Sequence, residues 1–399
     1  MTDPLRINPN VAAITPPAID HFNERIRVLE QEGNDVISLA QGVASFPPSE
    51  ESMAAVEKVL RERWISLYSP DPGLLEAREV ISKALSFKGL QLDPQGELLL
   101  TAGASQAFFL ALLCLARPGD EILLPSPYYF DHQYACLAAA CSVEEVPMKV
   151  ENGVWRFDVA AILKGLRAGA RIAVLVSPNN PTGAVMSKKD LQELSRGLEG
   201  CDGAIISDET YDRFNFQGEG EFLSPAALDG LKERTVVVGS FSKCLALAGW
   251  RIGYLHGPKT FVKEALKLQD SMMICAPVVS QVAAMAALKS GGVKVIEDRR
   301  RELLRRRDIL RQGLSSIDSL HWLEPSGAFF AFPSLDDDLD DREVALSLLE
   351  KAHVAVIPGS AFGRHGRGHL RLSFGNVEAA RLEEACRRVR EFFQNELEN

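Results

Sequence analysis

Short apolar runs alternate with amphipathic segments through the middle of the chain. Five runs, rich in apolar and β-branched residues, predict strands that are buried on both faces: residues 97–101, 121–125, 171–176, 203–207 and 235–238. Helical patterns lie between several of these runs, and the first two runs with the helix predicted at 105–116 form a βαβ unit. This order predicts an α/β fold with a mostly parallel sheet flanked by helices.

The chain on either side of this region has a different pattern. Amphipathic helices are predicted before it at 19–31, 50–63 and 74–85, and a short strand at 36–42 leads into a loop rich in Gly and Pro at 42–48. Long helices follow residue 270. Short strands at 328–332, 354–357 and 369–373 and a last helix at 377–393 then predict a smaller α+β domain. The acidic run at 336–341 predicts a solvated loop.

Composition and charge narrow the class of protein. The chain has 399 residues, of which 46% are hydrophobic and 25% charged, so it can bury a large core. A formal net charge of -10 argues against a nucleic acid or an anionic membrane as the main partner. The basic cluster at 298–308 alternates with acids, which is typical of an exposed helix face.

The seven cysteines are dispersed, with no CxxC pair and no regular spacing that would indicate a metal site. We therefore expect reduced thiols, no metal and a cytoplasmic protein. The longest apolar stretch, at 107–116, is too short to span a bilayer, and the first residues lack the apolar core of a signal peptide.

Polar residues follow four of the predicted strands, in the segments 101–105, 177–183, 207–211 and 240–243. Ligands of parallel α/β sheets bind beyond the carboxyl ends of the strands, so these segments predict one site. Lys243 could form a Schiff base with a carbonyl if cations or burial lower its pKa. Asp208, partly desolvated at a strand end, requires a cationic partner, and a protonated pyridine nitrogen would serve.

Other residues suit the same ligand, although each alone is more often a turn, cap, core or surface residue. Gly103, Ala104 and Ser105 open a helix whose free amides could bind a phosphate. Arg251 lies close enough in sequence to Ser240 and Lys243 to pair with that phosphate, and Arg371, in a strand-like segment, could bind a carboxylate. Further candidates are side chains that could hydrogen-bond a ring oxygen or stack on the ring: Asn180, Tyr211 and Tyr129.

Five motifs occur in a fixed order: NNPTG from Asn179, SDETY from Ser207, SFSK from Ser240, GWRIG from Gly249 and RLSFG from Arg371. In this order they resemble the class I aminotransferases of fold type I, which use pyridoxal 5′-phosphate. The resemblance runs from about Leu39 to Gly375. It implies a large domain at 46–285 with a sheet of the seven-stranded type, and a small discontinuous domain at 1–45 and 286–399.

The resemblance also implies roles for individual residues. Lys243 would hold the cofactor as an internal aldimine and act as the base, and Asp208 would pair with the pyridinium nitrogen. Arg371, helped by the Gly42 amide, would bind the substrate carboxylate, and Tyr68 would reach the cofactor of the other subunit in a homodimer. The remaining implied contacts are with the ring oxygen (Asn180, Tyr211), the ring face (Tyr129) and the phosphate (Gly103, Ala104, Ser105, Ser240, Arg251). A cis peptide is expected between Asn180 and Pro181.

The segments at 39–42 and 46–48 resemble the branch that contains kynurenine, glutamine and methionine aminotransferases and prokaryotic aspartate aminotransferases. The chain departs from that pattern at Ala44 and His132, which border the substrate, so the pattern does not predict which amino acid side chain the enzyme prefers. The resemblance implies an enzyme of amino acid metabolism, and the expected reaction is transamination from an L-amino acid to a 2-oxo acid. β-Elimination from a cysteine conjugate on the same site is the alternative.

Overall fold

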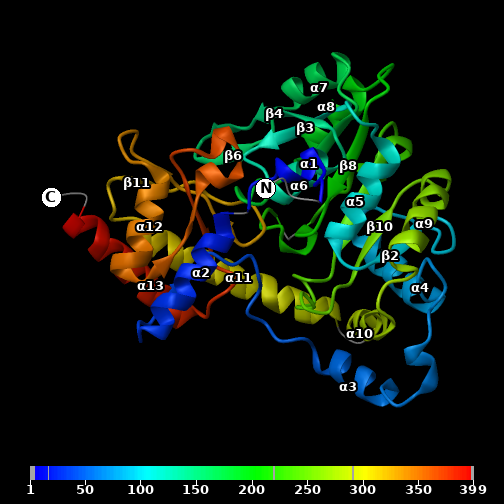
Figure 1. The fold of residues 1–399 in the computed structure, drawn as a ribbon, viewed down its shortest axis with the longest axis horizontal. Coiled ribbons are helices and arrows are strands. Elements are labelled where there is room, and N and C mark those ends of the chain that lie inside the picture. The colour runs from blue at the N-terminus through cyan, green and yellow to red at the C-terminus, as the bar shows by residue number, and fades with distance from the viewer. Residues whose placement is uncertain (1–4, 17, 219–220, 290–291, 397–399) are drawn as a thin grey trace.

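The protein is described from a computed structural model, which covers residues 5–16, 18–218, 221–289 and 292–396. Its centre is a seven-stranded sheet in the order β2-β10-β9-β8-β7-β3-β4 (Figure 1). The strands are β2 (Leu98–Thr101), β3 (Glu121–Ser126), β4 (Ser142–Pro147), β7 (Ile172–Val176), β8 (Ala204–Asp208), β9 (Thr235–Ser240) and β10 (Gly253–His256). Only β10 among them runs antiparallel to its neighbours, β2 and β9. The predicted mostly parallel α/β sheet is confirmed.

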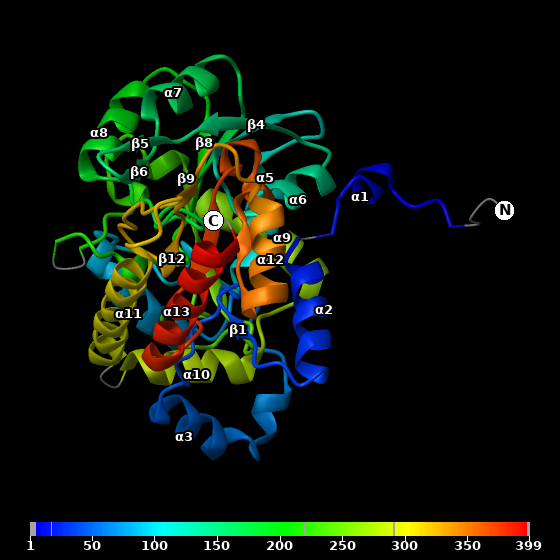
Figure 2. The same ribbon diagram turned by 90° about the vertical axis from the view of Figure 1, so that its left-hand side faces the viewer.

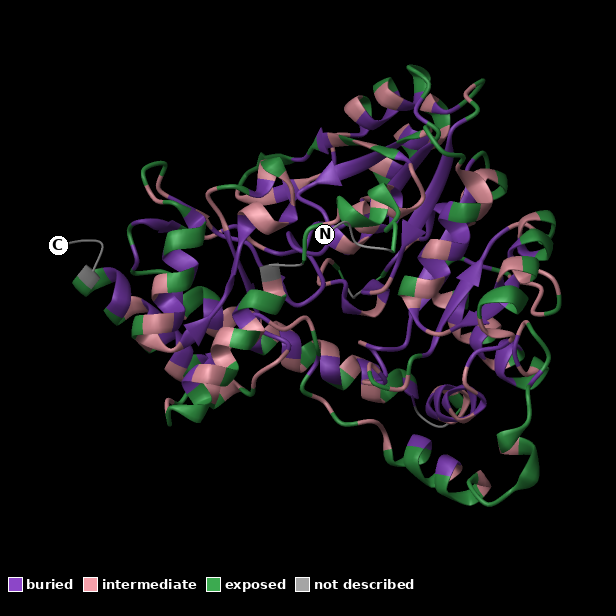
Figure 3. Cartoon of the chain, viewed as in Figure 1, coloured by how far each residue is buried: buried purple, intermediate pink, exposed green. Residues whose placement is uncertain are grey.

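Helices cover both faces of this sheet, and its strands are mostly buried except for β4 at the edge, whose residues other than Val146 are exposed or half-buried (Figure 3). Neighbouring residues of one strand enter different cores: Ile205 joins the core that contains α7 (Val159–Arg167) and α8 (Lys188–Gly197). Ile206 joins the core that contains α5 (Ala104–Leu115) and α9 (Lys259–Met273). The alternation follows from the two-residue period of side chains along a strand.

A second group of elements lies beside the sheet and is connected to it by the long helix α11 (Gly292–Leu314) (Figure 1). Its strands form small sheets: β12 (Phe330–Ala331), β16 (Leu370–Ser373) and β15 (Ile357–Pro358) in one, β11 (Leu320–His321) with β13 (Ser334–Leu335), and β1 (Ile37–Ser38) with β14 (Val354–Ala355). Helices α12 (Asp341–Ala352) and α13 (Ala379–Glu396) pack on them. The domain boundaries at residues 45 and 285 stay a prediction.

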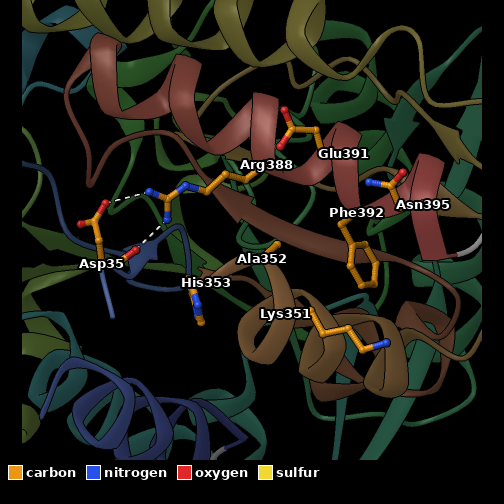
Figure 4. Close-up of a pocket in the computed structure, with 8 residues that line it drawn as sticks. All are labelled: Asp35, Lys351, Ala352, His353, Arg388, Glu391, Phe392 and Asn395. Atoms are coloured by element: carbon orange, nitrogen blue, oxygen red, sulfur yellow. Dashed lines mark hydrogen bonds and ion pairs between the residues drawn. The ribbon is translucent and has the colours of Figure 1, made fainter. Parts of the chain in front are cut away.

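The N-terminal region is tied to the C-terminal helix. Figure 4 shows Arg388 of α13 reaching Asp35, and the two side chains form an ion pair of 2.7 Å. Arg381 of the same helix pairs with Asp35 at 2.7 Å. The other helices of this region are α1 (Pro9–Ala12), α2 (Ala18–Gln31), α3 (Glu50–Val59) and α4 (Leu75–Ala84). Helix α1 stands out from the body of the molecule in Figure 2.

The structure differs from the predicted elements in several places. The acidic run at 336–341 is only partly a loop, because Asp340 caps α12 through the amides of Arg342 and Glu343. Asp341 begins that helix and is buried, accepting a hydrogen bond of 2.6 Å from the Ser360 amide. The helix predicted at 50–63 ends at Val59. No helix in the described part of the chain is long and apolar enough to cross a membrane.

Candidate active site

A cavity of about 540 Å³ opens at the carboxyl ends of the parallel strands. Eleven of the thirteen predicted site residues line it: Gly42, Ala104, Ser105, Tyr129, Asn180, Asp208, Tyr211, Ser240, Lys243, Arg251 and Arg371. Gly103 lies one residue outside this lining, as the N-cap of α5. Tyr68 is elsewhere, with 76% of its surface exposed. The fold therefore brings together predicted site residues that are up to 329 residues apart, from Gly42 in a loop to Arg371 in β16.

Lys243 extends into this cavity from the turn that follows β9. Its ammonium donates a hydrogen bond to the Gly42 carbonyl on the opposite wall. Burial, together with the nearby cations of Arg371 and Arg251, lowers the pKa of Lys243 to about 8, against the opposing effect of Asp208. A substantial fraction of this amine is therefore uncharged near neutral pH, which is the form that attacks a carbonyl.

Asp208 is the last residue of β8 and its carboxylate is almost completely buried, in contact with His132. The His132 Nε2 atom lies 3.1 Å from Asp208 Oδ2, and the Thr210 amide donates to Oδ1 at 3.0 Å. Burial raises the pKa of Asp208, but the hydrogen bonds from His132 and Thr210 outweigh it, so the pKa lies below its usual value. The carboxylate is therefore available to pair with a cation in the cavity.

His132 is a site residue whose contact the sequence did not reveal. It lies on α6 (Phe130–Ala138), with its ring 4.2 Å from the ring of Phe108. Helix α6 itself was not predicted, and 76 residues separate His132 from Asp208. The only indication from the sequence is that the family that this chain resembles often has an aromatic residue near the position of His132.

The N-terminus of α5 and Arg251 form a cradle for an anion. Gly103 has φ +86° and ψ 173°, a conformation that is essentially restricted to glycine. A Cβ at this position would lie 2.6 Å from Nη2 of Arg251, so no side chain fits between the helix and the guanidinium. Arg251 is held by the carbonyls of Ala248 and Ala102 at 2.9 and 3.3 Å. The first amides of a helix, beside a guanidinium, are a typical phosphate site.

Arg371 lies in β16 and is 2% exposed. It donates to Asn180 Oδ1 at 3.1 Å and to the Ala40 carbonyl, and its guanidinium lies 4.8 and 4.9 Å from the rings of Phe330 and Phe362. Burial lowers the pKa of Arg371 to about 10. Within the described ranges no carboxylate pairs with it and its Nε atom has no hydrogen-bond partner, so this cation can accept an anion from the cavity.

Two tyrosines complete the cavity walls. Tyr211 is buried edge-on against Phe329 and Phe330, at ring distances of 5.4 and 5.5 Å. Tyr129 donates a hydrogen bond of 2.5 Å to Asp131, which fixes the orientation of its ring. The peptide bond between Asn180 and Pro181 is cis, as expected.

Together these groups fit pyridoxal phosphate. The cavity offers an amine with a lowered pKa, a buried carboxylate for a protonated ring nitrogen, a phosphate cradle at a helix N-terminus, and a second buried cation for a carboxylate. The fit rests on charge: the buried side chains of Asp208 and Arg371 line the cavity, where the cofactor and an amino acid would supply groups of the opposite charge.

Comparisons with known proteins agree with this geometry. A family model described as aminotransferase class I and II matches residues 34–389. The chain is 34% identical to an aromatic-amino-acid aminotransferase 2 of Thermococcus litoralis over 90% of this chain and 92% of that protein. It is 35% identical to an aspartate aminotransferase of Pyrococcus abyssi, over 89% and 91%. A solved aspartate aminotransferase of Thermus thermophilus superimposes with a TM-score of 0.89 at 31% identity, over 97% of this chain and 99% of the other.

Proposed function

We propose that Lys243 is the catalytic residue of this chain, which belongs to the aminotransferase class I and II family and is a pyridoxal phosphate-dependent aminotransferase of fold type I. The enzyme moves an amino group from an amino acid to a 2-oxo acid. The observation that supports Lys243 is its amine, with a pKa near 8, in one cavity with Asp208 and Arg371. No comparison favours β-elimination over transamination.

Bound pyridoxal phosphate supplies an electron-deficient pyridine ring, which takes up the electrons released at the substrate α-carbon. Asp208 keeps the ring nitrogen protonated through an ion pair. The Lys243 amine would hold the cofactor, and as a free amine it would remove the proton from the substrate α-carbon. Arg371 and the Gly42 amide orient the substrate through its carboxylate.

Other residues at the cavity are assigned to the binding of the cofactor's phosphate and ring. The phosphate is bound by the start of α5 with Gly103, Ala104 and Ser105, and by Ser240 and Arg251. Asn180 and Tyr211 donate to the ring oxygen, and Tyr129 covers the ring face. These assignments are supported by the positions of the residues in the cavity lining and by Gly103 at the start of α5.

Product analysis tests the role of Lys243. Wild-type enzyme incubated with an amino acid and a 2-oxo acid should yield the exchanged pair, and Lys243→Ala should lose at least about 10⁴-fold in rate, because anchor and base are removed together. Pyruvate and ammonia released from a β-substituted amino acid without an acceptor would instead indicate elimination. Undiminished transamination by Lys243→Ala would refute the assignment.

We further propose a cytoplasmic homodimer in which Tyr68 reaches the active site of the partner subunit. Three large side chains of one segment support an interface, since Trp64, Leu67 and Tyr68 are 41%, 54% and 76% exposed. A cytoplasmic location is supported by the seven cysteines, all of which are free thiols.

Subunit mixing tests this arrangement. Lys243→Ala and Tyr68→Ala are each expected to be impaired. A mixture refolded together should recover activity, because a hybrid dimer contains one site with both an intact lysine and an intact tyrosine. A monomer in sedimentation, or no recovery in the mixture, would contradict the proposal.

For the amino donor we propose an uncharged side chain, and the cations of the cavity support this. In the part of the chain that the structure describes, Lys243, Arg251 and Arg371 are the only lysine or arginine residues lining the cavity, and each has a role. The remaining wall includes Ile19, Val43 and several aromatic rings. One relative reported above is named for aromatic amino acids, in agreement with such a donor, and two are named for aspartate, so the proposal rests on the cavity wall.

A donor panel tests this specificity. The kcat/KM of phenylalanine, methionine or leucine should exceed that of aspartate by about 100-fold or more, since a distal carboxylate would be buried without a partner. A preference for aspartate would show that a cation from outside the described chain, such as one of the partner subunit, completes the pocket.

A further inference from the structure

A second group of ionic side chains is buried beneath the active site and has no part in the proposed chemistry. Lys88 is the last residue of the 3-10 helix η2 (Leu85–Lys88) and is fully buried. Its three ammonium donors have three partners: Glu209 Oε2 at 2.5 Å, Asp212 Oδ2 at 2.8 Å and the Tyr254 hydroxyl at 2.8 Å. The hydrogen-bonding capacity of this ammonium is therefore used completely.

The carboxylate of Glu209 is equally well satisfied. Its Oε1 atom accepts hydrogen bonds from the hydroxyls of Ser207 and Ser224 at 3.0 and 2.6 Å. Its backbone amide donates to the Val238 carbonyl of β9 at 2.9 Å. A buried ionic network with every member paired is rigid, and it specifies one local arrangement of the backbone.

The acidic partners of Lys88 alternate with the cavity residues along the chain. Asp208 lines the cavity and Glu209 contacts Lys88, and Tyr211 lines the cavity and Asp212 contacts Lys88. Residues 209–212 form a turn, in which the Asp212 amide donates to the Glu209 carbonyl at 3.0 Å, so residues three apart in this segment lie on the same side of it. The segment 208–212 thus presents one set of side chains to the cofactor and is held from behind by the other set.

The same network reaches the neighbouring strand through Tyr254 of β10. The Tyr254 ring fills the space beside Gly239, where a Cβ would lie 2.0 Å from Tyr254 Cζ. Gly239 immediately precedes Ser240, which lines the cavity. Lys88 is therefore connected to the ends of two adjacent strands, β8 and β9, that carry cavity residues.

We propose that Lys88 is a positioning residue of the aminotransferase reaction, which through Glu209 and Asp212 holds Asp208 and Tyr211 against the cofactor. The proposal rests on the proposed roles of those two residues. Lys88 itself touches neither substrate nor cofactor. Its removal is expected to leave the carboxylate site at Arg371 intact and to misplace the groups that face the ring.

The test compares the full-length holoenzyme with its Lys88→Met variant. We expect kcat to fall at least tenfold while KM for the amino donor changes less than threefold. The visible absorbance of the bound cofactor should also change its pH midpoint by more than half a pH unit. In cofactor-free protein, amide hydrogen exchange in peptides covering 205–214 should accelerate at least tenfold, with peptides of α11 unchanged.

Two further variants separate positioning from general stability. His256→Phe removes another buried polar side chain of β10, one that hydrogen-bonds the Glu97 carbonyl at 2.9 Å. It should lower the melting temperature without moving kcat or the absorbance midpoint. If Lys88→Met does not fold, Tyr254→Phe removes one partner of the ammonium and should lower kcat two- to fivefold in the same pattern.

The proposal is overturned if Lys88→Met, or Tyr254→Phe in its place, loses thermal stability while kcat, the absorbance midpoint and exchange at 205–214 stay at wild-type values. A wild-type protein that neither binds the cofactor nor transaminates would instead refute the proposed function. The two failures are therefore distinguishable.

Discussion

Replacing Arg371 by alanine removes the group to which we assign the substrate carboxylate. Arg371 is 2% exposed, its guanidinium is flanked by Phe330 and Phe362, and its Nε atom has no hydrogen-bond partner among the residues that the structure describes. The cost of burying this cation is already met in the folded protein, so a carboxylate that binds it gains charge-assisted hydrogen bonds without that penalty.

The size of the effect follows from those hydrogen bonds. A hydrogen bond to a charged group contributes about 1.5–3 kcal/mol, and a planar fork can form two with one carboxylate. A loss of about 3–5 kcal/mol corresponds to a fall in kcat/KM of roughly 200- to 5,000-fold. Arg371→Lys keeps the charge without the fork and should recover part of the loss.

The assay is steady-state transamination with a panel of amino donors that differ only in side chain. Since every donor carries the same α-carboxylate, Arg371→Ala should raise KM for all of them by a similar factor. Arg364→Ala, at an exposed arginine paired with Glu145 and Glu144, is the control and should behave as wild type. Unchanged half-saturation across the panel in Arg371→Ala would refute the assignment.

Three other predictions test the cofactor side of the cavity. Asp208→Asn should reduce kcat at least about 100-fold, because the pyridine nitrogen loses its buried ionic partner, and a rate within threefold of wild type would contradict that role. Gly103→Ala places a methyl group 2.6 Å from Arg251 Nη2, and alanine in this backbone conformation costs about 1–3 kcal/mol. Titration of the apoprotein with the cofactor should therefore show an affinity that is weaker by roughly tenfold or more. In the apoprotein, labelling of Lys243 by an amine reagent should rise with pH around a midpoint near 8, below which the amine is protonated, whereas a midpoint above 10 would show an ordinary lysine.

The strands and the site at their ends could be predicted from the sequence because burial on both faces leaves a direct signal. Residues such as Ile205 and Ile206 face different cores, so the whole run is apolar, and the polar residue that ends it, Asp208, marks the edge where ligands bind. The resemblance carried by the motif order then implied roles for Lys243 and Arg371, which line the same cavity.

Contacts between distant segments could not be predicted in the same way. The hydrogen bond between His132 and Asp208 depends on how α6 packs on the sheet, and no local pattern encodes that packing. The sequence does not indicate that Lys88 is buried either, because a single lysine is usually exposed, and its burial is possible only because Glu209 and Asp212 contact it in the fold. Asp341 is a similar case, because the acidic run predicts a loop and the hydrogen bond that buries Asp341 comes from Ser360, 19 residues later in the chain.

The central claim is that Lys243 binds the cofactor covalently, and borohydride reduction tests it most directly. Purified protein with pyridoxal phosphate should absorb in the visible range and lose that band when an amino acid is added. After reduction and proteolysis, mass spectrometry should find the cofactor mass on the peptide that contains Lys243. A colourless protein without an adduct, or an adduct on another lysine, would contradict the account.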